Sequence, residues 1–131
     1  MSDDRPAAPP KAGKSLRILV VEDHAETLRV LARLLDHFGH QTSVADSTHS
    51  ALQFLQSKAF DVILSDIVLP DGSGYDIVSQ AKRKQAVKAV ALTGFHGEED
   101  IRRGKEAGFD FHLSKPVDFH ELRTVLDQVS A

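Results

Sequence analysis

Short apolar runs alternate with amphipathic helical patterns along almost the whole chain, and this alternation restricts the possible folds more than any other feature. The runs are Leu16–Val21, Thr42–Ala45, Val62–Leu64, Ala89–Leu92 and Phe109–Leu113. Because they are continuously apolar, they are typical of strands that are covered on both faces. Between them, apolar residues recur at the three- and four-residue steps of a helix. The first such set is Leu28, Leu31, Leu35 and Phe38.

Local signals predict where several helices begin or end. Gly39 follows the first helical pattern and is placed to stop it, and Ser47 is a candidate cap for the second. Asp118 and Glu121 have capping-box spacing at the start of the last. The alternation therefore predicts an α/β fold, a (βα)5 domain whose five-stranded parallel sheet carries helices on both faces. Right-handed crossovers favour the flavodoxin-like strand order 2-1-3-4-5.

Length and composition bound the class of protein. The 131 residues suffice for one domain at residues 16–131, and residues 1–15 are rich in Pro, Ala, Lys and Asp, which predicts a flexible arm. The lack of cysteine excludes disulfides and thiolate metal sites. No apolar run approaches the roughly 20 residues that span a bilayer, so we expect a cytoplasmic protein without a membrane segment. A net charge of −3 without a basic stripe argues against nucleic-acid binding.

Polar residues with chemical potential stand at the ends of the expected strands. Glu22 and Asp23 follow the first strand, Asp66 the third, Thr93 the fourth and Lys115 the fifth. In a parallel α/β sheet, ligands bind beyond the carboxyl ends of the strands, at the switch between strands one and three. We therefore expect these side chains to converge at one edge of the sheet.

Each of these residues also has an ordinary structural interpretation. Asp23 is a possible helix cap, and Asp66 a possible turn residue before a Pro- and Gly-rich loop. Thr93 is a common strand residue, and Lys115 by default is solvated. Pro116 is suited simply to ending a strand. The pattern as a whole, rather than any single residue, favours a functional site.

Three carboxylates at one edge repel one another and require a compensating cation. Oxygen ligands without Cys favour Mg²⁺ or Mn²⁺. Three negative charges, a divalent ion and the ammonium of Lys115 sum to zero, which suits a site that accepts a phosphoryl group. A carboxylate is also a competent nucleophile for forming an aspartyl phosphate.

The motifs "ILVVED", "DVILSDIVLPDGSG", "AVALTG" and "HLSKP", in this order, resemble the receiver domain of two-component response regulators. The resemblance covers about residues 16–131. It implies that Asp66 is the phosphoacceptor, that Asp23 binds Mg²⁺ directly, and that Glu22 acts mainly through a metal-bound water. It also implies that the backbone carbonyl of Val68 completes the protein's share of the metal shell.

The same resemblance assigns roles on the other side of the phosphoryl group. Thr93 is implied to hydrogen-bond the phosphoryl oxygen and Lys115 to pair with it, with a cis bond between Lys115 and Pro116. His112 stands where the family usually has Tyr or Phe as a rotameric switch. A histidine there adds possible pH sensitivity, and the alternative is an ordinary, partly exposed strand residue.

Two apolar residues suggest how long the phosphoryl group persists. Val68 and Phe95 lie two positions after Asp66 and Thr93, where the resemblance places the flanks of the hydrolytic water's path. Neither can orient a water, so we hypothesise slow loss of phosphate. The loop "GFHGEED" is where a phosphorylation-driven shift is expected to be easiest.

The resulting functional prediction is a phosphorylation switch. A histidine kinase or a histidine phosphotransfer protein would phosphorylate Asp66, and the change would alter a surface for a downstream protein partner or a homodimer. The receiver-like region extends to the last residue given, Ala131, without an added output segment. The chain is therefore expected to signal by binding, to relay phosphate, or to be part of a larger protein. It would turn over no external substrate and so would not be an enzyme.

Three other functions remain to be compared. One is a phosphorylation-independent interaction module. A metal-dependent phosphatase of the haloacid dehalogenase type would need two aspartates two residues apart after the first strand, where this chain has adjacent acids. A flavin-binding module would need a phosphate loop there, and "EDHAE" would repel the phosphate.

Overall fold

The computed structural model describes residues 15–94 and 97–130. Its elements in chain order are β1 (Arg17–Val21), α1 (Ala25–His37), β2 (Gln41–Ala45), α2 (Thr48–Ser57), β3 (Val62–Asp66), β4 (Val68–Leu69), β5 (Gly72–Ser73), α3 (Gly74–Lys84), β6 (Lys88–Thr93), α4 (Glu98–Ala107), β7 (Phe111–Ser114) and α5 (Phe119–Ser130). The expected arm, except for Ser15, lies outside the described residues, as do Phe95 and His96.

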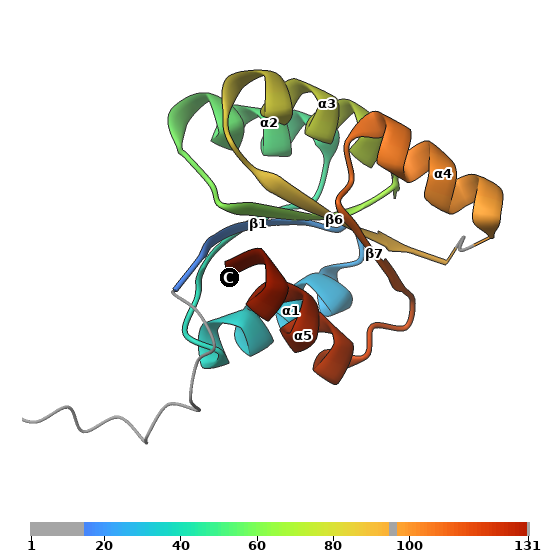
Figure 1. Ribbon diagram of the computed structural model, residues 1–131. Helices are drawn as coiled ribbons and strands as arrows, with labels where there is room; N and C mark the ends of the chain where they lie inside the picture. Colours follow the sequence, from blue (N-terminus) through green and yellow to red (C-terminus); the bar gives the residue numbers. More distant parts are fainter. Residues whose placement is uncertain (1–14, 95–96, 131) are drawn as a thin grey trace, which may run out of the picture.

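The main sheet has the strand order β2-β1-β3-β6-β7, and every neighbouring pair in it is parallel. Strands β6 and β7 are the fourth and fifth predicted strands, because β4 and β5 form a separate hairpin. The predicted α/β class and the flavodoxin-like order are therefore confirmed. Figure 1 shows the sheet edge-on between two layers of helices.

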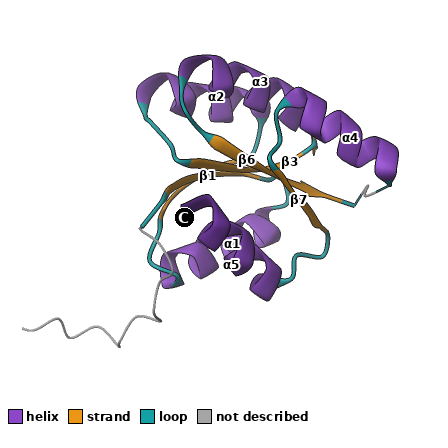
Figure 2. Ribbon diagram, in the orientation of Figure 1, coloured by secondary structure: helices purple, strands orange, loops and turns teal. Residues whose placement is uncertain are grey.

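Helices α1 and α5 cover one face of the sheet, and α2, α3 and α4 cover the other (Figures 1 and 2). The alternation of side chains along each strand divides the core into two clusters. Ile18 and Val20 of β1 pack on the α1 and α5 side, whereas Leu19 and Val21 pack on the α2 and α3 side. Because successive strand residues point to opposite faces, both must be apolar when both faces are covered. This explains the continuous apolar runs.

The predicted helix ends are confirmed at three places. The Ser47 hydroxyl accepts a hydrogen bond from the Ser50 N–H at 3.1 Å and so caps α2. A carboxylate oxygen of Asp118 accepts the N–H of Glu121 at 3.2 Å and so caps α5. Gly39 has a φ of 94°, the left-handed conformation that glycine adopts readily after a helix.

The structure differs from the sequence-based expectation in the β4–β5 hairpin, in the start of β7 and in the exposure of β2. The hairpin of β4 and β5 was not predicted, since two-residue strands are too short to show a pattern. The last strand begins at Phe111 rather than Phe109, because Phe109 is still tied to the end of α4 by a bond from its N–H to Gly104 O at 2.9 Å. Strand β2 lies at the sheet edge, and its Val44 is 42% exposed rather than covered on both faces.

Within residues 15–94 and 97–130, no helix has both the length and the apolarity needed to cross a membrane.

Candidate functional site

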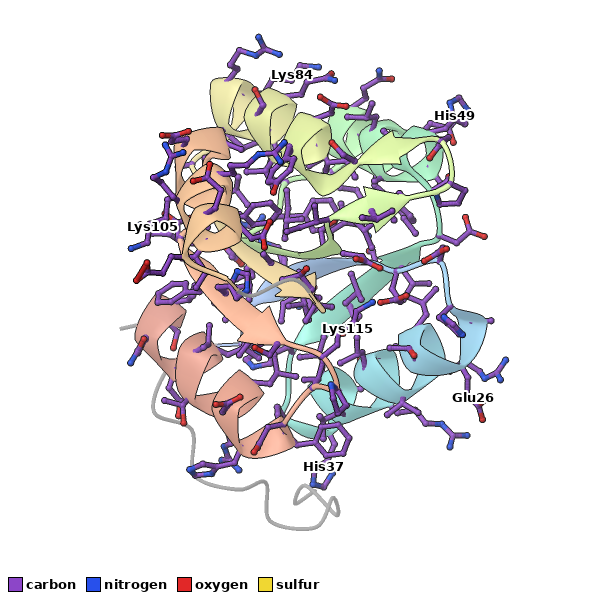
Figure 3. All side chains as sticks on the ribbon, turned by 90° about the vertical axis from the view of Figure 1, so that its right-hand side faces the viewer. Glu26, His37, His49, Lys84, Lys105 and Lys115 are labelled. Carbon is purple, nitrogen blue, oxygen red and sulfur yellow. The ribbon has the colours of Figure 1, made fainter. Side chains whose placement is uncertain are left out.

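Strand periodicity carries three charged residues to the same side of the sheet. Glu22, Asp66 and Lys115 each lie two positions beyond a residue that packs in the α1 and α5 cluster. Those preceding residues are Val20, Leu64 and Leu113. Since side chains repeat every second residue along a strand, the charged groups emerge on that same side. Figure 3 looks onto the carboxyl edge of the sheet and shows Lys115 between the two helical layers.

The ammonium of Lys115 bridges two carboxylates. Lys115 Nζ lies 2.8 Å from Asp66 Oδ2 and 2.9 Å from Glu22 Oε1. The ordinary interpretation of Lys115 as a solvated side chain is therefore wrong. The bridge links the ends of β1, β3 and β7, so one cation draws together residues far apart in the sequence.

Glu22 is a buried charge whose two oxygens both have partners. The residue is 0% exposed. Oε1 pairs with Lys115, and Oε2 accepts the backbone N–H of His24 at 3.0 Å. A buried carboxylate without such partners would be strongly destabilising. The site is thus held in place by pairing as well as by the strands.

Burial alone would lower the pKa of Lys115, but hydrogen bonds and charge from Asp66 and Glu22 outweigh it and leave that pKa above its usual range. A raised pKa keeps the ammonium charged throughout the neutral range. Its stabilising contribution is therefore lost only as the pH rises through this raised pKa.

The acidic cluster satisfies the chemistry of a divalent cation site. Glu22, Asp23 and Asp66 each offer a carboxylate oxygen, and these oxygens lie within 4.8 Å of one another. Glu22 and Asp66 are buried, whereas Asp23 is exposed. One ammonium beside three carboxylates leaves an excess of negative charge that a hard divalent ion would compensate.

Asp23 does not cap α1. His24, rather than Asp23, occupies the N-cap position, and the side chain of His24 makes no capping hydrogen bond. The carboxylate of Asp23 is thus not engaged in the role that its ordinary interpretation gave it. Asp66 is likewise the last residue of β3 rather than a turn residue.

Thr93 ends β6 one position beyond the register partner of Asp66, which is Leu92. It is 1% exposed, and its backbone oxygen accepts the N–H of Lys115 at 2.9 Å. The adjacent Lys115–Pro116 peptide bond is cis. A backbone hydrogen bond thus joins the end of β6 to Lys115, the residue whose ammonium contacts Glu22 and Asp66.

His112 lies in β7, opposite Ala91 in the sheet, and is half-buried. Together with Ile101 and Gly104 of α4 it lines a cavity of about 80 Å³. The structure therefore places His112 between the sheet and α4, close to the site but outside the acidic cluster. The switch role of His112 stays a prediction.

Gly74 is a site residue that the sequence analysis did not single out. A Cβ at this position would lie 2.3 Å from the backbone oxygen of Asp66 and 3.0 Å from Ser65 Oγ. Ser65 Oγ in turn donates to that same Asp66 oxygen at 2.7 Å. Only glycine allows α3 to begin this close to the end of β3. The sequence did contain a signal for this contact: Gly74 is the second glycine of "GSG", and a turn alone does not explain a second glycine there.

Val68 is 59% exposed, and its backbone N–H donates to Asp66 Oδ1 at 3.3 Å. The first residue of the hairpin is thus fastened to the second carboxylate oxygen of Asp66. Phe95, its expected counterpart across the water path, lies outside the described residues.

A parallel sheet of this order, with adjacent acids after the first strand and a lysine that bridges one of them, Glu22, to the strand-end Asp66, defines a receiver-type signalling domain. The family model described as the response regulator receiver domain matches residues 18–127. The chain belongs to this family. Its members are signalling modules of two-component systems.

Similar proteins include both sensors and regulators. The chain is 34% identical over 133 residues to the virulence sensor protein BvgS of Bordetella pertussis, a match that covers 95% of this chain and 11% of that protein. It is 38% identical over 109 residues to the phosphate regulon transcriptional regulatory protein PhoB of Escherichia coli, covering 81% of this chain and 48% of that protein. The chain thus spans only part of each relative.

A solved receiver domain (CheY-like) from Methylobacillus flagellatus has the same fold. It superposes with a TM-score of 0.76 at 30% identity, covering 88% of this chain and 99% of that chain. The similarity therefore extends over nearly the whole of the described domain.

Proposed function

We propose that Asp66 accepts a phosphoryl group from a phosphohistidine in a Mg²⁺-dependent reaction, and that the modified domain presents an altered surface to a protein partner. The observation that carries this proposal is the bridge from Lys115 to Asp66 and Glu22, beside an acidic cluster with excess negative charge. Such a site combines a carboxylate nucleophile with one fixed cation, the lysine ammonium, and with carboxylates that could bind a second cation, a metal ion.

The chemistry requires few groups. A carboxylate oxygen of Asp66 attacks phosphorus, the bond from phosphorus to the donor histidine nitrogen breaks, and its electron pair stays on the imidazole. The product is an acyl phosphate on Asp66. Lys115 is proposed to pair with the phosphoryl oxygens, and its contact with Asp66 Oδ2 supports this role. Thr93 is proposed to donate its hydroxyl to another of these oxygens.

The metal would be held by the carboxylates of Glu22, Asp23 and Asp66 and by the backbone carbonyl of Val68. The donors are all oxygen, which suits Mg²⁺ and also Mn²⁺. When bound, the ion neutralises charge on the phosphoryl oxygens during transfer. Lys115 must then share Glu22 and Asp66 with the metal, so the lysine bridge is expected to loosen on metal binding.

We propose that a groove beside the site is the surface that binds the phosphodonor protein. It has a volume of about 400 Å³ and is lined by residues of α1 and of the segment from Lys115 to α5. Val30 and Phe119, both in this lining, are 45% and 48% exposed. Exposed apolar side chains beside a reactive site favour a protein partner. We take this partner to be a histidine kinase or a histidine phosphotransfer protein in the cytoplasm, where the kinase draws on ATP.

On this proposal the domain promotes its own phosphorylation but turns over no external substrate, so it is a switch rather than an enzyme. The relatives that carry similar domains within sensor and regulator proteins are consistent with either a relay or an output role. Its downstream partner would bind the surface that responds to phosphorylation.

The proposal is tested by incubating the protein with Mg²⁺ and a small phosphodonor such as acetyl phosphate, then measuring its intact mass. We expect one added phosphoryl group in the wild type and none in Asp66→Asn or after removal of the metal. Metal binding without any added mass would favour a phosphorylation-independent interaction module instead.

A further inference from the structure

The hairpin that follows Asp66 depends on its surroundings for its position. It pairs only Val68 with Ser73 and Leu69 with Gly72. A two-stranded ribbon of this size has too few bonds to be stable alone in water. The contacts that the hairpin makes with the rest of the domain must therefore fix where Val68 lies.

The base of the hairpin is fixed to β3. Gly74 N–H donates to Ile67 O at 2.8 Å, and Gly74 lies against the backbone of Asp66. Ile67 and Leu69 are each 6% exposed and anchor the first strand in the core. These contacts hold the two ends of the hairpin, but they leave its tip unsupported.

The tip is fixed by Asp71, which reaches a different helix. Its two carboxylate oxygens accept the backbone N–H groups of Thr48 at 2.7 Å and His49 at 2.9 Å, the first two residues of α2. These two bonds lower the pKa of Asp71 below its usual range, so the carboxylate is charged at neutral pH. The positive end of the α2 dipole favours that charge.

Helix α2 has a cap of its own. Ser47 satisfies the N–H of Ser50, and Asp71 satisfies the N–H groups of Thr48 and His49. The two side chains thus accept, between them, three of the backbone N–H groups at the start of α2. Ser47 is local to α2, whereas Asp71 comes from the hairpin, more than 20 residues away in the sequence. Of these two capping residues, Asp71 is the one that ties the helix to the loop that carries Val68.

We propose that Asp71 is a positioning residue for the metal site: by fastening the hairpin tip to α2, it keeps the Val68 carbonyl in place beside the three carboxylates. This inference rests on the proposed function, because it requires that the cluster bind a divalent ion. Without the tether, the hairpin would pivot about its base, and the loop's contribution to metal binding would weaken.

The test is the affinity of the folded protein for Mg²⁺, measured by titration calorimetry. Loss of an outer support of a metal site typically weakens binding by 10- to 100-fold, so we expect Asp71→Ala to bind about tenfold more weakly. Asp71→Asn keeps one acceptor oxygen and should fall between the two. Amide hydrogen exchange at Thr48, His49 and Val68 should speed up in Asp71→Ala.

Two matched controls separate positioning from simpler effects. Ser47→Ala removes the other cap of α2 without touching the hairpin, and should lower stability while leaving Mg²⁺ affinity unchanged. Asp76→Asn removes an exposed negative charge from the first turn of α3 and should also leave the affinity unchanged. Circular dichroism establishes that each variant is folded.

The inference is overturned if Asp71→Ala binds Mg²⁺ as tightly as the wild type, or if Ser47→Ala or Asp76→Asn weakens binding to the same extent. A wild-type protein that binds no Mg²⁺ would contradict the metal part of the proposed function as well. Because the wild type is measured first, the two failures are distinguishable.

Discussion

Helices α3 and α4 lie side by side on the same face of the sheet, yet the core holds them very differently (Figure 1). Helix α3 buries Gly74, Ile77, Val78 and Ala81. Of the residues of α4, all of which are described, only Gly104 is buried. Helix α3 is thus anchored in the core beside the site, whereas α4 buries little of its surface against the domain.

The local contacts explain this difference. Helix α3 begins where Gly74 touches the backbone of Asp66, so the start of α3 cannot move without moving Asp66. Helix α4 contacts α3 at the surface through Arg103, whose guanidinium carbon lies 5.6 Å from the centre of the Tyr75 ring. The cavity beside His112 also lies under α4. This difference fits the proposed switch, because a helix with few buried contacts can change its position at a lower free-energy cost than the closely packed site.

The largest effect should come from Gly74→Ala. The added Cβ would lie 2.3 Å from Asp66 O, a backbone atom that cannot yield, so we expect a loss of about 3 kcal/mol in the free energy of unfolding. Mg²⁺ binding should be lost with it. Urea denaturation and calorimetry measure the two effects.

Gly94→Ala is the matched control for that substitution. In the described part of the chain, nothing lies within 4 Å of a Cβ placed at Gly94. It should therefore change stability very little. Equal effects of the two substitutions would contradict the account of a close-packed link between β3 and α3.

Lys115→Met should have the next largest effect, because it leaves Glu22 buried without its cationic partner. Breaking a fully buried pair costs more, but the lysine side chain is 30% exposed, so we expect about 2 kcal/mol. Added Mg²⁺ should restore more stability to this variant than to the wild type, since the ion replaces the missing charge. Thermal unfolding with and without Mg²⁺ measures both.

The exposed Lys105 on α4 provides the control, and Lys105→Met should be nearly neutral. The double variant Glu22→Gln with Lys115→Met should recover part of the lost stability, because the buried charge is then absent. A double variant as unstable as the sum of its parts would argue against pairing as the cause.

A smaller and opposite effect is expected from Gly104→Ala. A Cβ there would meet Phe109 at 3.9 Å, an ordinary contact, and alanine is favoured over glycine within a helix. We expect a gain of about 1 kcal/mol. Hydrogen exchange should slow in α4 but not in α3, and loss of stability would show that α4 is packed more tightly than described.

Arg103→Ala should have the smallest effect. It removes a cation from the face of the Tyr75 ring, an interaction worth about 0.5 kcal/mol. Exchange of the α4 amides should become slightly faster while Mg²⁺ affinity stays unchanged. A change in Mg²⁺ affinity would mean that α4 and the site are coupled even before phosphorylation.

The sequence predicted the sheet and the candidate site better than it predicted their connections. Continuous apolar runs specify strands covered on both faces, and strand ends in such a sheet meet at one edge. The sequence alone therefore predicted that Glu22, Asp66 and Lys115 lie close together. Their position depends on where the strands end and on the two-residue period of strand side chains, and the apolar runs in the sequence show where the strands end.

The hairpin and its tether could not be predicted in the same way. Asp71 reads as an ordinary turn residue, and its bonds to Thr48 and His49 exist only because the fold brings α2 beside the loop. The start of β7 was misjudged for a related reason: Phe109 is as apolar as a strand residue, but its N–H serves the end of α4. Contacts between distant backbone groups leave no local pattern.

The most direct test of the central claim is hydrogen exchange, measured residue by residue, with and without Mg²⁺ and beryllium fluoride, a mimic of the bound phosphoryl group. The account predicts that exchange in α4 changes most, that β1, β3 and α3 change little, and that Asp66→Asn abolishes the response. An unchanged α4, or the same response in Asp66→Asn, would contradict it.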